Sequence, residues 1–186
     1  RKSQYFPKPD KKTKPNEYLA LQFSHPRWIV DRWSQTFKFD KLAEMLAANN
    51  KQPPISIRIN TMKTNVENSN DLMSQLLKEE KIKSDRRPLR SAITLKSTPL
   101  FSQDSMFGRG LYTVQDEASQ LIGYIVDPKE GETVVDACAG SGGKLSHLFE
   151  LSEGKADLTG IDPDPAAMKR GQETLARLGH EGVKWE

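Results

Sequence analysis

Apolar and polar residues follow two different periods along this chain, and the changes of period divide it into regions. Residues 1–16 are rich in lysine and proline with almost no apolar content, which predicts a flexible basic arm. Apolar residues then recur at helical spacing, so we expect one helix to start at Pro26 and a second to be capped by Asp40. The proline pair at 53–54 ends this helical segment.

The next stretch alternates with the two-residue period of a β-strand. Residues 55–60, Ile-Ser-Ile-Arg-Ile-Asn, predict a half-buried strand. A helix is expected at about 66–78, and short strands around Ile82 and at 93–95. This order suggests that residues 17–106 form a helical segment and a small α+β domain, similar to an RNA-recognition or ferredoxin-like half. Its strands lack the aromatic pair that stacks bases in a true RNA-recognition motif.

Helices and strands are expected to alternate in the last part of the chain. The pattern predicts, in order, a helix over 115–126, a strand over 133–135, a helix that buries Leu145, Leu148 and Leu151, a strand over 157–161 and a helix over 165–178. The two strands and the helices that follow them form a βαβα unit. This predicts an α/β fold in which residues 107–186 begin a Rossmann-like, doubly wound sheet.

Such a sheet is incomplete with two strands. Its first strand is normally central, with helices on both faces and neighbours on both edges. A sheet that stopped after the second strand would leave apolar surface and an unpaired edge open to solvent. We therefore expect this chain to be a truncated part of a longer enzyme.

The most informative motif lies between the first strand and its helix. Residues 136–144, Asp-Ala-Cys-Ala-Gly-Ser-Gly-Gly-Lys, form a glycine loop of the kind that holds nucleotide-type cofactors. A phosphate-binding P-loop is excluded because Cys138 stands where its first glycine is needed, and a dinucleotide motif fails at Leu145. Asp162, 22 positions beyond Gly140, ends the second strand and can accept hydrogen bonds from ribose hydroxyls. This arrangement is typical of class I S-adenosylmethionine methyltransferases.

Charge is divided unevenly along the chain. Residues 1–115 carry 21 Lys and Arg against 11 Asp and Glu, whereas residues 116–186 carry 7 against 14. The basic part has either a nucleic-acid-binding surface or a solvated lysine-rich face, and charge alone favours neither. The single cysteine excludes an internal disulfide framework and fits a reducing cytoplasm. No apolar run approaches the roughly 20 residues of a membrane span, so we expect no membrane partner.

Several separate blocks, in order, resemble one family. Residues 21–28, 31–33, 53–61, 112–119 and 136–144 are similar to successive motifs of the Sun family of RNA cytosine-5 methyltransferases. The resemblance implies S-adenosyl-L-methionine as methyl donor and a cytosine in RNA, ribosomal RNA first of all, as acceptor. It also implies that Asp162 holds the ribose and that the cofactor is lined by Cys138, Ala139, Gly140, Ser141, Gly142, Gly143 and Lys144. The family usually has Ala-Pro where Gly140 and Ser141 stand here.

Methylation at carbon 5 of cytosine requires a thiolate that first adds to carbon 6. The resemblance implies two cysteines in motifs that would fall beyond residue 186. Cys138 is then either the nucleophile or a small side chain packed beside the cofactor, and we favour the second. We accordingly predict no catalytic residue and no metal site in this chain, and its oligomeric state is left open. The alternative functions are a noncatalytic RNA- and cofactor-binding module and a transfer RNA methyltransferase.

Other conspicuous side chains have ordinary interpretations. The three histidines lack metal-ligand spacing, so surface or capping roles are expected for His25, His147 and His180. Trp28 and Trp33 are expected in the core. Arg58 is either an RNA contact or a solvated arginine.

Overall fold

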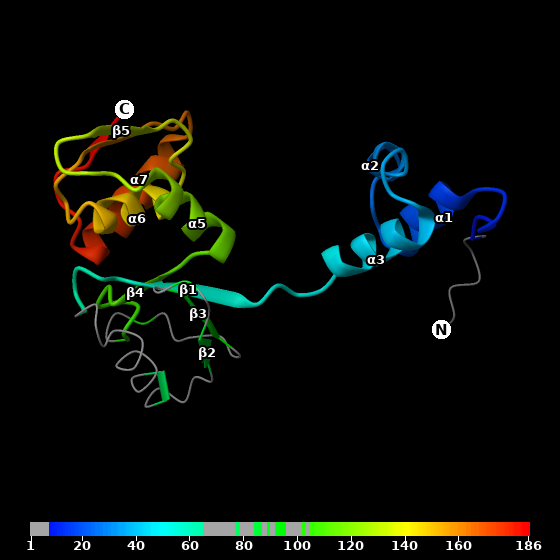
Figure 1. The fold of residues 1–186 in the computed structure, drawn as a ribbon, viewed down its shortest axis with the longest axis horizontal. Helices are drawn as coiled ribbons and strands as arrows, with labels where there is room; N and C mark the ends of the chain where they lie inside the picture. The colour runs from blue at the N-terminus through cyan, green and yellow to red at the C-terminus, as the bar shows by residue number, and fades with distance from the viewer. Residues whose placement is uncertain are drawn as a thin grey trace. The chain divides into compact units, whose positions relative to one another are not determined.

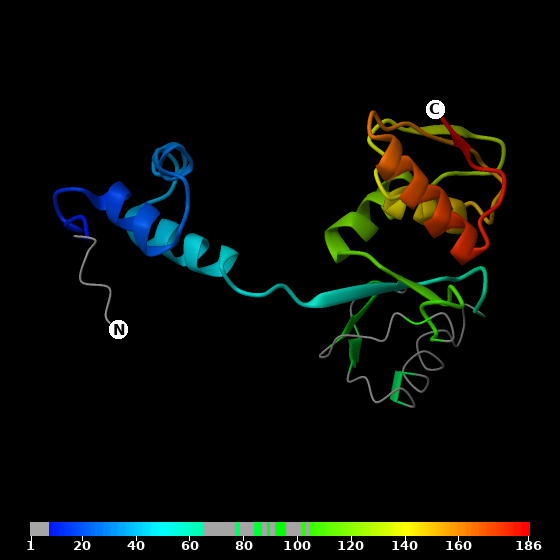
Figure 2. The same cartoon turned by 180° about the vertical axis from the view of Figure 1, so that it is seen from behind.

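A computed structural model describes residues 8–64, 77–78, 84–86, 89, 92–95, 102 and 105–186. The chain divides into two compact units, residues 1–53 and 54–186. Figure 1 and Figure 2 show the chain from opposite sides.

The first unit is a group of three helices. They are α1 (Pro15–Gln22), α2 (Arg27–Trp33) and α3 (Phe39–Asn49). Their apolar faces meet in a small core of Leu19, Val30, Leu42 and Leu46. Helix α1 begins inside the segment for which a flexible arm was predicted, and Asp40 lies in the first turn of α3, after the capping residue Lys38.

The two tryptophans of α2 differ in their surroundings. Trp33 packs against the core of the helical unit, as predicted. The side chain of Trp28 is 68% exposed, so its prediction as a core residue is wrong. Helix α2 has only seven residues, and its buried side is already occupied by Val30.

The second unit begins with an antiparallel sheet. Its strands are β1 (Ile55–Ile59), β2 (Ser84–Arg86), β3 (Ala92–Leu95) and β4 (Tyr112–Val114), in the order β2-β3-β1-β4. Strands β1 and β3 confirm predictions, whereas β4 was not predicted. The expected strand around Ile82 lies outside the described residues, as does all of the expected helix except residues 77–78.

Strand β1 is more deeply buried than its alternating pattern predicted. Ile57 and Ile59 contribute to the core of the sheet, yet Ser56 and Arg58, on the opposite face, are also buried. Helix α6 (Gly143–Leu151) covers this second face of β1, where it contacts Arg58. The prediction of a half-buried strand is therefore wrong.

The rest of the unit has the predicted α/β order. Helix α5 (Glu117–Val126) precedes strand β5 (Thr133–Asp136), α6, strand β6 (Asp157–Gly160) and helix α7 (Pro165–Leu178). A short third strand, β7 (Lys184–Trp185), was not predicted and pairs with β6, which gives a parallel sheet in the order β5-β6-β7. Both views show α6 and α7 between strand β5 and the sheet that contains β1 (Figure 1; Figure 2). Helices α6 and α7 supply most of the core beneath the parallel sheet.

Apolar side chains remain exposed in this unit. Val134 on β5 packs against the core beneath α6, while Val135, on the opposite face of the strand, is 53% exposed. Helix α5 also exposes Leu121, Ile122, Ile125 and Val126. None of the described helices combines the length and the apolar character that crossing a bilayer would require.

Candidate cofactor site

The glycine loop turns sharply after strand β5. The Asp136 carboxylate accepts a hydrogen bond from the Cys138 N–H at 3.2 Å, and the Ala139 carbonyl accepts one from the Gly142 N–H at 2.8 Å. Gly140 and Gly142 have φ values of 52° and 75°. Side chains with a Cβ rarely adopt this conformation, which explains glycine at both positions.

Asp162 joins the loop to the end of β6. One carboxylate oxygen accepts the Gly140 N–H at 2.8 Å, and the other accepts the Asp164 N–H at 2.9 Å. Each carboxylate oxygen has a second lone pair, so Asp162 can still accept a hydrogen bond from a ligand hydroxyl. The two sequence-predicted parts of the site, 22 residues apart, are therefore in direct contact.

The glycines of the loop serve two different purposes. A Cβ placed on Gly142 would lie 2.8 Å from Leu175, so this glycine allows α7 to pack closely against the loop. A Cβ on Gly140 or Gly143 would meet no atom within 4 Å. Open space therefore lies over both glycines, as a cofactor approaching the backbone requires.

The other predicted loop residues are partly open to solvent. Ala139 is buried, whereas Cys138, Ser141 and Lys144 are exposed. Cys138 is exposed at this loop, and its packing beside a cofactor stays a prediction. The first N–H groups of α6 follow directly after this loop, and a helix leaves them without intrahelical acceptors, so they are available to a ligand.

Arg58 is fully buried next to the loop. It is therefore neither an RNA contact nor a solvated arginine, the two interpretations that the sequence suggested. Its guanidinium contacts the Glu150 carboxylate at 2.8 Å and the Ser146 hydroxyl at 2.8 Å. It also donates to the Gly143 carbonyl at 2.9 Å and to the side chain of Gln115. In the sequence, the only sign of this buried cluster was Glu150, a charged residue between apolar residues of α6.

Two histidines are also buried, contrary to the surface roles predicted for them. The rings of His147 and Tyr124 form a T-shaped pair with centroids 5.0 Å apart, and His180 stacks on Phe149 with centroids 4.6 Å apart. Burial, assisted by the positive charge of Arg58, lowers the pKa of His147 and of His180 to about 3. Burial also raises the pKa of the Glu150 carboxyl, and Arg58 opposes that rise.

The described residues contain no group of three or more His, Cys, Asp or Glu side chains arranged to hold a metal ion.

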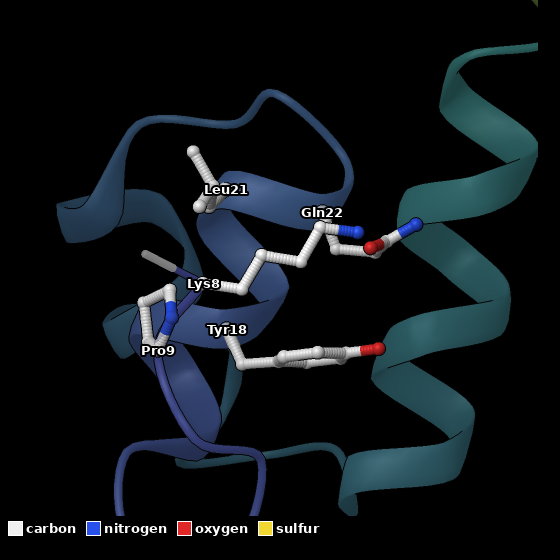
Figure 3. Close-up of a pocket in the computed structure, with 5 residues that line it drawn as sticks. All are labelled: Lys8, Pro9, Tyr18, Leu21 and Gln22. Atoms are coloured by element: carbon white, nitrogen blue, oxygen red, sulfur yellow. The ribbon is translucent and has the colours of Figure 1, made fainter. Parts of the chain in front are cut away.

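A separate surface pocket lies on the helical unit. Figure 3 shows its lining residues, which come from α1 and the segment before it: Lys8, Pro9, Tyr18, Leu21 and Gln22. Its lysine, aromatic ring and amide are groups that contact nucleotides in RNA-binding proteins.

Two family models match this chain. Residues 25–100 match the ferredoxin-like domain of RsmF/B-like methyltransferases, and residues 123–185 match the family described as 16S rRNA methyltransferase RsmB/F. The chain belongs to the RsmB/F methyltransferase family. The predicted membership of the Sun family is thereby confirmed, as is the predicted ferredoxin-like half.

Individual relatives of the RsmB/F family agree. The chain is 31% identical over 165 residues to a probable ribosomal RNA small subunit methyltransferase B of Bacillus subtilis, covering 89% of this chain and 36% of the relative. It is 32% identical over 159 residues to ribosomal RNA small subunit methyltransferase B of Pasteurella multocida, with 86% and 34% covered. The chain thus spans about a third of the length of these curated relatives.

Solved structures show the same fold. The crystal structure of PH0851 matches with a TM-score of 0.83 and 33% identity, covering 98% of this chain and 40% of that one. A methyltransferase homologue from Pyrococcus horikoshii matches with a TM-score of 0.76 and 27% identity, covering 90% and 54%. The predicted combination of a small α+β domain with a Rossmann-like methyltransferase domain is confirmed.

Proposed function

We propose that this chain provides the RNA-binding and cofactor-loop portion of an enzyme that methylates carbon 5 of a cytosine in RNA, with small-subunit ribosomal RNA as substrate. The observation that carries the proposal is the hydrogen bond between Asp162 and Gly140, which joins the ribose-binding candidate to the glycine loop. Open space lies over Gly140. The names of the family and of its relatives support ribosomal RNA as the substrate.

S-adenosyl-L-methionine supplies the electrophilic methyl group of this reaction. The residues that would hold it are those of the loop, Cys138 to Lys144, with Asp162 on its ribose. Gly140 and Gly143 leave room for the ligand, and the N–H groups at the start of α6 present donors to its polar part. The donor set and the open glycines fit a nucleoside-containing cofactor.

The basic part of the chain is proposed to bind RNA. On the helical unit, exposed basic side chains include Lys8 and Arg32, and the ring of Trp28 is 68% exposed. Aromatic faces stack on unpaired bases and lysines neutralise phosphates. These features favour an RNA contact over a merely solvated basic face.

The thiolate that adds to carbon 6 is proposed to come from outside residues 1–186. Cys138 is the only cysteine of the chain and lies in the cofactor loop. Because that loop is proposed to bind the methyl donor, we assign this thiol to the cofactor site rather than to the target base. We therefore assign no catalytic residue within this chain.

A methylation assay on defined RNAs tests the proposal. The protein, produced as its whole gene encodes it, is incubated with S-adenosylmethionine labelled in its methyl group and with 16S ribosomal RNA or transfer RNA. We expect labelled 5-methylcytosine in ribosomal RNA alone. Label in transfer RNA alone would change the substrate, and cofactor binding without label in either RNA would favour the noncatalytic module.

A further inference from the structure

A buried cluster joins the antiparallel sheet to the glycine loop. Arg58, the fourth of the five residues of β1, is 0% exposed, and its partner Glu150 on α6 has a side chain that is 2% exposed. Both belong to the unit formed by residues 54–186. An apolar pair of similar volume would stabilise such an interface as well or better, because burying two charges carries a large desolvation cost. The charged cluster therefore requires a reason other than stability.

All five N–H donors of Arg58 have acceptors in this cluster. Nε and Nη2 donate to the two Glu150 oxygens at 3.3 and 2.8 Å, and Nη2 also donates to the Ser146 hydroxyl at 2.8 Å. Nη1 donates to the Gln115 side chain and to the Gly143 carbonyl at 2.9 Å. A guanidinium with every donor used is held in one orientation.

The contacts converge on one carbonyl. Besides Arg58, the Gly143 oxygen accepts hydrogen bonds from Gln115 Nε2 at 3.2 Å and from the Ser146 hydroxyl at 2.9 Å. Gly143 is the last glycine of the loop and the first residue of α6. Its carbonyl and the Lys144 N–H belong to the same planar peptide group and point in opposite directions. Fixing the carbonyl behind the loop thus fixes the direction of the N–H in front of it.

We propose that Arg58 is a positioning residue for the cofactor: with Gln115 and Ser146 it holds the Gly143–Lys144 peptide so that its N–H faces the bound ligand. This inference rests on the proposed cofactor function of the glycine loop. Glycine needs such support because it is the most conformationally free residue. Strand β1 therefore sets the geometry of a loop that lies 85 residues away in the sequence.

Lys63 offers a matched control. It is also a cationic side chain that ties the turn after β1 to the α/β part of the unit. Its Nζ donates to the carbonyls of Arg109 and Arg177 at 2.9 and 3.0 Å, both outside the glycine loop. Loss of Lys63 weakens the attachment between the two parts without releasing the Gly143 peptide.

The test is calorimetric titration with S-adenosylmethionine, using the protein as its whole gene encodes it. Arg58→Lys keeps the charge next to Glu150, but one ammonium cannot reach all of the acceptors. Gln115→Glu keeps an acceptor for Arg58 and removes the donor to Gly143. We expect the cofactor dissociation constant to rise at least tenfold in R58K and at least threefold in Q115E, and to change less than twofold in K63M. Thermal unfolding of each variant shows how far stability alone accounts for the change.

The outcomes separate this inference from the proposed function. A wild-type protein that binds no S-adenosylmethionine overturns the proposed function, and this inference with it. Wild-type protein that binds, with R58K and Q115E binding equally well, overturns the positioning role alone. An affinity loss in K63M as large as in R58K, at an equal loss of thermal stability, also overturns it, because the effect is then one of general destabilisation. If R58K does not fold, Q115E decides by the same criteria.

Discussion

Whether a single residue of this chain is buried depends on which other parts of the chain pack against it. Arg58 and His147 look like ordinary surface residues in the sequence, yet both are buried against α6 or within it. Trp28 looks like a core residue and is largely exposed. Local pattern determines which side chains share a face, but it does not determine whether that face is covered.

The buried histidines predict a dependence of stability on pH. The unfolded chain takes up a proton on each near pH 6.5, whereas His147 and His180 in the folded chain do so only near pH 3. The contribution of the two buried, neutral histidines to the free energy of unfolding is complete above about pH 6.5, and it is lost as the pH falls toward about 3. As the pH falls through that window, the free energy of unfolding should decrease by up to about 1.4 kcal/mol per pH unit for each histidine.

Urea unfolding at a series of pH values from 7.5 to 4.5 measures this effect. His147→Gln removes one of the two groups, so we expect the slope below pH 6 to fall by up to about 1.4 kcal/mol per pH unit. His25→Gln is the control, since His25 is only partly buried. An H147Q variant with the slope of the wild-type protein would contradict the assignment.

The elements of the α/β part followed from local signals. Helix α7 begins and ends at the predicted residues because Asp164 caps it, Pro165 starts it and Gly179, with a φ of 79°, ends it. Strands β4 and β7 were missed because three and two residues are too few to show a period. Both short strands exist because a longer strand beside them supplies hydrogen-bond partners.

The contact between α5 and α6 gives a prediction at this scale. A Cβ on Gly123 would lie 2.3 Å from Nδ1 of His147, whereas a Cβ on Gly143 would meet nothing within 4 Å. Gly123→Ala should therefore lower the free energy of unfolding by about 1–3 kcal/mol, although alanine is the better helix former by about 1 kcal/mol. Gly143→Ala should leave stability unchanged or slightly higher. Thermal and urea unfolding of both variants compare the two, and equal effects would argue against close packing at Gly123.

At the scale of the whole molecule, the described chain consists of two compact units joined by a short connection. Residues 51–54 are exposed and lie in neither a helix nor a strand. Each unit has its own core, that of the helical unit being centred on Leu19 and Leu46. An exposed segment between two independent cores is the preferred place for proteolysis.

Limited proteolysis tests this division. We expect trypsin to cleave after Lys51 early in the digestion and to leave a stable fragment that begins at Gln52, as identified by mass spectrometry. Lys51→Gln should delay that cleavage while cuts before residue 15 continue. First cuts within residues 105–186 would contradict the division.

The sequence by itself determined the α/β order, the glycine loop, the contact partner Asp162 and the family, because each rests on local spacing or on motifs in fixed order. The tertiary structure decided what covers the loop from behind. Arg58, Gln115 and Ser146 lie 57 and 31 residues apart along the chain and meet at one carbonyl only after the antiparallel sheet has packed against α6. Long-range packing of this kind has no period and no motif, so the pattern of residues alone does not reveal it.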